Sequence, residues 1–168
     1  MAHKNVATYL NDHLAGSTTV LELLEHLAAA YAGGRIAQFA TELRAEITAD
    51  RLELEALMAK LNVTPSGPRR ASAWLVEKLA ELKLRIDDPK AGALRLLEAT
   101  EAISLGIEGK RLLWLALADA ARNEAGLCKT DYDRLIRRAE DQRRRVETVR
   151  LEAARAVLVV APQAVPSG

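Results

Sequence analysis

Cysteine and aromatic residues are scarce in this chain. Its 168 residues include one cysteine, Cys128, so no disulfide can form within the chain and nothing indicates an oxidising compartment. The aromatic residues are two Trp, three Tyr and one Phe. Because 49% of the residues are nevertheless hydrophobic, and Ala, Leu, Glu and Arg dominate, the composition is typical of packed helices.

Long apolar runs and a strong net charge are lacking too. The longest apolar stretches, 112–118 and 156–162, are too short to span a bilayer, and the first ten residues lack a cationic flank followed by an apolar run. A net charge of +1 gives no general attraction to nucleic acid or to anionic membranes. We therefore expect a soluble, cytoplasmic protein of one domain, 1–168, with no membrane partner.

Residues 36–61 carry an unbroken apolar stripe with one charged residue at its centre. The spacing alternates four and three, so on a helix these side chains form one seam suited to another helix: Ile36, Ala40, Leu43, Ile47, Asp50, Leu54, Leu57 and Leu61. Asp50 therefore points inward. An unpaired carboxylate removed from water costs several kcal/mol, so either Asp50 has a partner on another helix or the seam is open to water there.

Similar apolar patterns predict four further helices, and glycine and proline mark their ends. We expect helices at about 5–31, 35–61, 71–85, 90–121 and 130–160, and a frayed tail at 161–168. In the helix at 90–121, Gly106 and Gly109 suggest either a close helix approach or a local irregularity. In the helix at 130–160, Gln142 lies on the apolar stripe and repeats the anomaly of Asp50.

The lengths of the connections predict how the helices are arranged. Short turns make 5–31 the antiparallel neighbour of 35–61, and 90–121 that of 130–160. The long connection between the two hairpins makes the second and third long helices parallel. The predicted fold is an all-α four-helix bundle with a short additional helix, 71–85, in the crossover.

This helix order resembles the ferritin-like superfamily, and the crossover helix is similar to that of its small stress-associated bacterial members. Di-iron members carry a Glu on each of two helices and a Glu-x-x-His on each of the other two. Here Glu46 is followed three residues later by Ala49, and Glu140 by Arg143, so both imidazoles are missing. The first helix has Ser17 at its midpoint in place of a Glu. The resemblance therefore implies a degenerate di-metal motif.

Polar pairs are the alternative to metals at this level of the bundle. Counting along the first hairpin places Ser17 opposite Asp50, and His13 one turn away. Arg143 stands where the superfamily would place a histidine, and its guanidinium, alone or together with that of Arg111, could bridge carboxylates of Asp50, Glu46 or Glu108. The alternative is that Arg143 extends along the bundle edge to water. The predicted buried polar cluster comprises His13, Ser17, Asp50, Gln142 and Arg143.

Three functional hypotheses follow. In the first, the chain is a non-catalytic bundle without a cofactor, an interaction or assembly protein with no catalytic residues. In the second, a divergent metal site binds or oxidises iron, or holds manganese, through Glu46, Asp50, Glu101, Glu108 and Glu140. In the third, arginines of the last helix bind anions, but acidic residues interrupt that row and no aromatic residues interleave it, so we do not expect a nucleic-acid site.

Charge is distributed unevenly between the helices, which bears on partners. No Lys or Arg occurs between Asn5 and Tyr31, whereas the last helix is rich in arginine. An acidic helix of one copy would complement the basic helix of another. We therefore expect a homodimer, and the same surfaces are compatible with a different protein partner.

Overall fold

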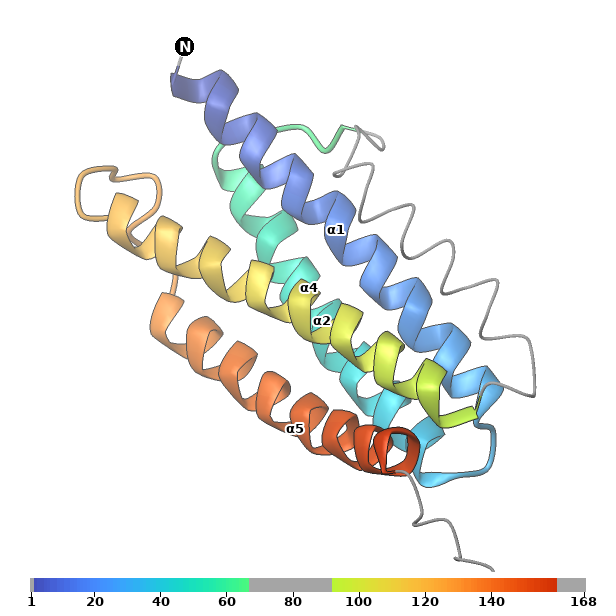
Figure 1. The fold of residues 1–168 in the computed structure, drawn as a ribbon. Coiled ribbons are helices and arrows are strands. Elements are labelled where there is room, and N and C mark those ends of the chain that lie inside the picture. Colours follow the sequence, from blue (N-terminus) through green and yellow to red (C-terminus); the bar gives the residue numbers. More distant parts are fainter. Residues whose placement is uncertain (1, 67–91, 160–168) are drawn as a thin grey trace, which may run out of the picture.

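The computed structural model describes residues 2–66 and 92–159. Within these ranges the chain forms four helices and no strand (Figure 1): α1 (Ala2–Ala30), α2 (Arg35–Lys60), α4 (Gly92–Ala120) and α5 (Tyr132–Leu158). The prediction of an all-α fold with four long helices that pack together is confirmed. The helix predicted at 71–85 and the tail at 161–168 lie outside the described residues.

Single residues at the helix termini explain where α1 and α2 end and where α5 begins. Gly33 takes a left-handed conformation (φ 78°) in the turn after α1, which a residue with a side chain rarely adopts. Asn62 does the same after α2 (φ 54°), and the Val63 N–H then donates to the carbonyl of Met58 at 2.9 Å. Asp131 caps α5, because its side chain accepts a hydrogen bond from the Arg134 N–H at 3.0 Å.

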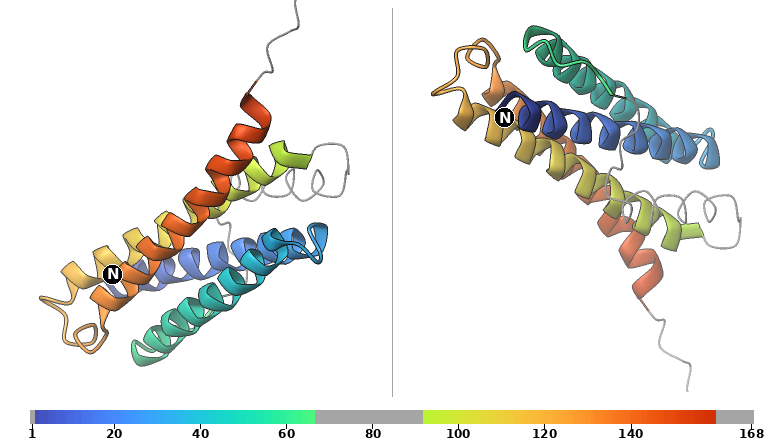
Figure 2. Two further views of the ribbon diagram at one scale, coloured as in Figure 1. Left: turned by 90° about the horizontal axis from the view of Figure 1, so that it is seen from below. Right: turned by 90° about the horizontal axis from the view of Figure 1, so that it is seen from above.

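Two apolar clusters fill the bundle, one on each side of a polar layer. One cluster joins the end of α1 and the start of α2 to the start of α4 and the end of α5. The other joins Leu10 of α1 and Leu135 of α5 to Leu57 of α2 and Leu117 of α4. Therefore α2 and α4 run in one direction, and α1 and α5 in the other. Figure 2 shows the two hairpins, α1–α2 and α4–α5, as two layers.

The residues that flank the connection 67–91 are fixed at opposite ends of α1. The Asn11 side chain accepts from the Ser66 N–H at 2.6 Å and donates to the Thr64 carbonyl at 3.3 Å. At the other end of α1, the Tyr31 hydroxyl donates to the Gly92 carbonyl at 3.0 Å. These contacts set the parallel direction of α2 and α4 that the length of the connection predicts.

Gly106 lies where α4 comes close to α1. A Cβ atom at Gly106 would lie 2.5 Å from Cγ2 of Val20, whereas one at Gly109 or at Gly16 would meet no atom of the described residues within 4 Å. Of the two explanations for the glycines of this helix, close helix approach therefore holds at Gly106 and not at Gly109.

Gly106→Ala is expected to destabilise the bundle by about 1 to 3 kcal/mol, because the buried, branched Val20 cannot move away without strain. Gly16→Ala is the matched control in α1. It adds a methyl group in open space and should stabilise by up to about 1 kcal/mol through helix propensity alone. Urea unfolding of the two variants measures both changes. A stabilising Gly106→Ala would contradict the close approach of α1 and α4.

Candidate functional site

Asp50 is the centre of the polar layer. Its place on the apolar stripe of α2 turns it into the bundle, where its side chain is 2% exposed. Oδ2 accepts hydrogen bonds from Nζ of Lys110 on α4 and from Nε2 of Gln142 on α5, the latter at 3.0 Å. Oδ1 forms an ion pair with Arg138 of α5. One carboxylate therefore links three helices.

Gln142 connects this carboxylate to its neighbours. The side chain is fully buried, its oxygen accepts from Lys110, and its nitrogen donates to Asp50 and, at 3.2 Å, to Glu46 of α2. Glu46 in turn pairs with Arg145. A neutral amide can donate and accept at once, so Gln142 joins the Asp50 and Glu46 pairs into one network.

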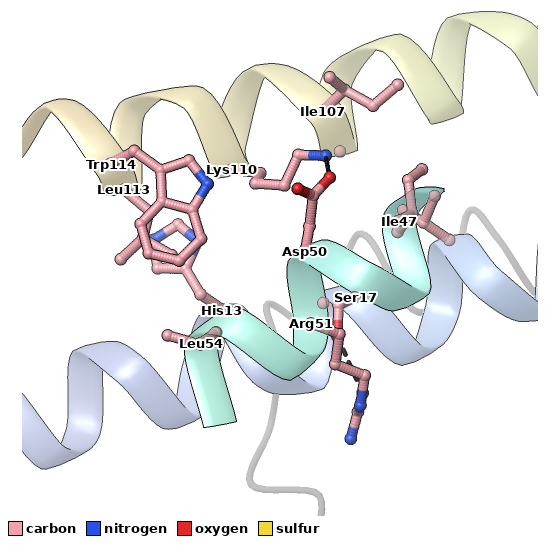
Figure 3. A pocket seen from close by; sticks show the side chains of 13 residues that line it. His13, Ser17, Ile47, Asp50, Arg51, Leu54, Ile107, Lys110, Leu113 and Trp114 are labelled. Carbon is pink, nitrogen blue, oxygen red and sulfur yellow. Dashed lines mark hydrogen bonds and ion pairs between the residues drawn. The ribbon is translucent and has the colours of Figure 1, made fainter. Parts of the chain in front are cut away.

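Lys110 is the cation that reaches Asp50 across the bundle (Figure 3). Burial lowers the pKa of its ammonium group, and the charge of Asp50 opposes part of that shift. The layer also contains Arg138, whose side chain is 26% exposed. Asp50 thus faces two cations. In the described residues, neither Lys110 nor Arg138 forms an ion pair with another carboxylate.

A second set of ion pairs lies along the α4–α5 face. Arg111 donates to both oxygens of Glu108 at 2.9 Å, and Arg143 donates to Glu108 at 2.6 Å. These hydrogen bonds, that from Arg111 first, lower the pKa of Glu108. Arg111 also lies 3.7 Å from Glu140. The two arginines thereby neutralise Glu108 and Glu140.

Arg150 continues this row toward the end of α5. It donates twice to Glu147 at 2.7 Å and once to Glu101 of α4 at 3.5 Å. The first of these contacts lowers the pKa of Glu147. The row is partly exposed, so its pairs add little to the stability of the fold. Those of Arg150 with Glu101, Arg143 with Glu108 and Arg111 with Glu140 join α4 to α5.

A small pocket opens beside the polar layer, between α1, α2 and α4 (Figure 3). Its volume is about 50 Å³. His13 lines it, and burial lowers the pKa of that imidazole, which favours the neutral ring. The His13 ring meets the Tyr9 ring edge-on, with centroids 4.7 Å apart. These contacts explain His13 as a packed, uncharged side chain.

The predicted partners of Asp50 need correction. Ser17 lines the same pocket, but its hydroxyl donates to the Leu14 carbonyl at 2.6 Å and accepts from Arg51 at 2.8 Å, so its partner is not Asp50. Arg143 pairs with Glu108 instead of Asp50. One residue of α5 turns the chain by about 100°, so Arg143 points toward α4 while Gln142 points inward. Of the predicted cluster, only Asp50 and Gln142 are joined to each other.

Sequence reasoning missed Lys110 and Arg138. A signal for Lys110 was present: Ile103, Ile107, Lys110, Trp114 and Leu117 have the four-three spacing that singled out Asp50. Arg138 lies one helical turn before Gln142, which places it on the same side of α5. The inward-facing Lys110 of α4 thus supplies a positive charge opposite the inward-facing Asp50 of α2.

The five candidate metal ligands all face cations. Each carboxylate has an arginine or lysine partner: Glu46 with Arg145, Asp50 with Lys110 and Arg138, Glu101 with Arg150, Glu108 with Arg111 and Arg143, and Glu140 with Arg111. In residues 2–66 and 92–159 no three His, Cys, Asp or Glu side chains are grouped so that they could hold a metal ion. A metal would have to displace these cations.

The same ranges contain no helix that is both long and apolar enough to cross a membrane. No family model, curated protein or solved structure matches the chain.

Proposed function

We propose that this protein is a non-catalytic, ferritin-like helical bundle in which buried ion pairs take the place of a metal centre. It acts through its surfaces, as an interaction or assembly protein of the cytoplasm. The order and directions of the four helices support the ferritin-like part of the proposal, since two hairpins joined by a long connection characterise that superfamily.

The observation that carries the proposal is the pairing of Asp50 with Lys110 and Arg138. A carboxylate that binds iron or manganese must offer its oxygens to the metal, and a neighbouring cation competes for those oxygens. At the level where a di-metal site would lie, Arg145 forms an ion pair with Glu46, and Arg143 forms one with Glu108. These ion pairs hold the helices together, and the surfaces of the bundle bind its partners.

Metal content tests this proposal against the alternative of a divergent iron or manganese site. Protein purified from iron- and manganese-supplemented growth is expected to contain substoichiometric metal by mass spectrometry. Dialysis against Fe²⁺ or Mn²⁺ should not raise the metal content, because a bound metal ion would leave the buried Lys and Arg side chains without their carboxylate partners.

Glu46→Gln and Glu42→Gln form the matched pair for this experiment. Both lie on α2, but Glu42 is exposed and accepts only from Gln38 among the described hydrogen bonds, at 2.9 Å. Stoichiometric metal in the wild type that is lost in Glu46→Gln and kept in Glu42→Gln would overturn the ion-pair proposal. It would establish the carboxylate-rich metal site instead.

A further inference from the structure

Helix α4 carries a second apolar stripe on its side outside the core, except for Ala102 at its start, which is partly buried and packs against the core. Its members alternate three and four residues apart and are small or apolar: Ala102, Leu105, Gly109, Leu112 and Ala116. Leu105 is 59% exposed and Leu112 is 50% exposed. We call these five residues the outer stripe of α4. Surface helices of a bundle usually present charged residues on this side.

The spacing of the outer stripe is that of a coiled-coil seam. Leu105 and Leu112 occupy equivalent positions seven residues apart, and Ala102, Gly109 and Ala116 occupy the other position. Small residues there let two helix backbones approach closely, and a Cβ atom at Gly109 would meet no atom of residues 2–66 or 92–159 within 4 Å. The stripe therefore suits another helix of the same kind.

We propose that the outer stripe of α4 binds the outer stripe of a second copy of this chain, in parallel, about a two-fold axis that runs along α4. This inference rests on the proposed function as an assembly protein and names its partner. In a parallel pair each leucine meets its own copy and each small residue meets its own copy, so the stripe is self-complementary.

Charge complementarity selects the parallel pairing. Helix α4 contacts both α1 and α5 and lies between them (Figure 1). A two-fold axis along α4 places α1 on the same side as the partner's α5, whereas an axis across α4 places α1 beside the partner's α1. The sequence of α1 has three Asp or Glu and one Lys, whereas that of α5 has eight Arg and five Asp or Glu, so the two helices carry opposite net charge. Arg144 of α5 is paired with Asp141 of the same helix. The parallel dimer therefore brings unlike charges to the same side.

Sedimentation equilibrium of the full chain tests the surface. The wild type is expected to be a dimer at micromolar concentration. Leu105→Glu and Leu112→Glu should each raise the dimer dissociation constant by about 100-fold or more, because two carboxylates then face each other across the axis. Leu52→Glu on α2 is the matched control, since Leu52 is also 59% exposed, and it should leave the constant unchanged. Circular dichroism verifies that each variant is folded.

Disulfide cross-linking tests the direction of pairing. In a Cys128→Ser background, Leu105→Cys and Leu112→Cys should each cross-link to themselves under oxidised glutathione, and Leu52→Cys should not. Cross-links that form only when the two cysteine variants are mixed would overturn the parallel arrangement. A monomeric wild type, or a dimer that Leu105→Glu and Leu112→Glu leave intact, would overturn the surface itself.

These outcomes are independent of the metal measurement. A metal-free monomer would refute the α4 pairing and leave the ion-paired core unaffected. A dimer with stoichiometric metal that depends on Glu46 would refute the proposed function and leave the α4 surface unaffected.

Discussion

Asp50→Asn is expected to lower the free energy of unfolding by about 3 to 5 kcal/mol. The substitution keeps the size and shape of the side chain, so it creates no cavity. It removes the only negative charge that pairs with Lys110 and Arg138 among the described residues. The Lys110 side chain is 14% exposed and would remain in the bundle without its ion-pair partner, with the Gln142 oxygen and the charge of Glu46 as its remaining compensation. Urea unfolding at neutral pH measures the loss.

Asp119→Asn is the control for this substitution. Asp119 lies 3.7 Å from Arg122 near the end of α4, and both side chains are about four-fifths exposed. A pair of this kind contributes about 0 to 1 kcal/mol, so the control variant should unfold almost as the wild type does. If Asp50→Asn lowers the free energy of unfolding no more than Asp119→Asn does, then water screens Asp50 and the polar layer is not buried.

Trp114→Ala is expected to cost about 3 to 5 kcal/mol, the usual penalty for removing a fully buried aromatic side chain. Trp114 is 1% exposed and belongs to the apolar cluster between the polar layer and the start of α1. Its ring lies 6.5 Å from that of Tyr132, centroid to centroid, which joins α4 to the start of α5. Thermal and urea unfolding both report this loss.

Trp114→Phe measures how much of this loss an aromatic ring at the same position restores. The indole Nε1 is buried and has no hydrogen-bond partner in the part of the chain that the structure describes. Phe keeps one six-membered ring and loses the five-membered ring with this unpaired N–H, so the variant leaves a smaller cavity than Ala and should cost less than Trp114→Ala. Equal losses in the two variants would mean that the six-membered ring contributes little to the packing of the cluster.

The sequence predicted the fold through periodicity. The four-three stripes determine which residues face inward, and the short and long connections determine the directions of the helices. Asp50 and Gln142 could be recognised as inward polar residues for the same reason. What lies between Ser66 and Gly92, including the helix predicted at 71–85 with Trp74, is outside the described residues.

The partners of Asp50 could be predicted only in part. Lys110 has the spacing of an inward residue, but it lies in a polar stretch that includes Glu108 and Arg111, which obscures the stripe. The choice among arginines depends on the direction in which each leaves α5. Arg138 points toward α2 and Arg143 toward α4, and a long, flexible side chain reaches several carboxylates from either position. Periodicity predicts which residues are buried, but it does not predict which carboxylate a long side chain contacts.

A double-mutant cycle between Asp50 and Lys110 tests the central claim most directly. Asp50→Leu should destabilise because it leaves Lys110 without its carboxylate partner, and Lys110→Met because it leaves Asp50 with Arg138 as its one remaining cation among the described ion pairs. Arg138, which is partly exposed, can turn to water in the double variant. The double variant should then recover most of the loss, with a coupling free energy of about 2 kcal/mol or more in urea unfolding. Losses that add to within about 0.5 kcal/mol would show that the two residues are uncoupled, and would contradict a core held by buried ion pairs.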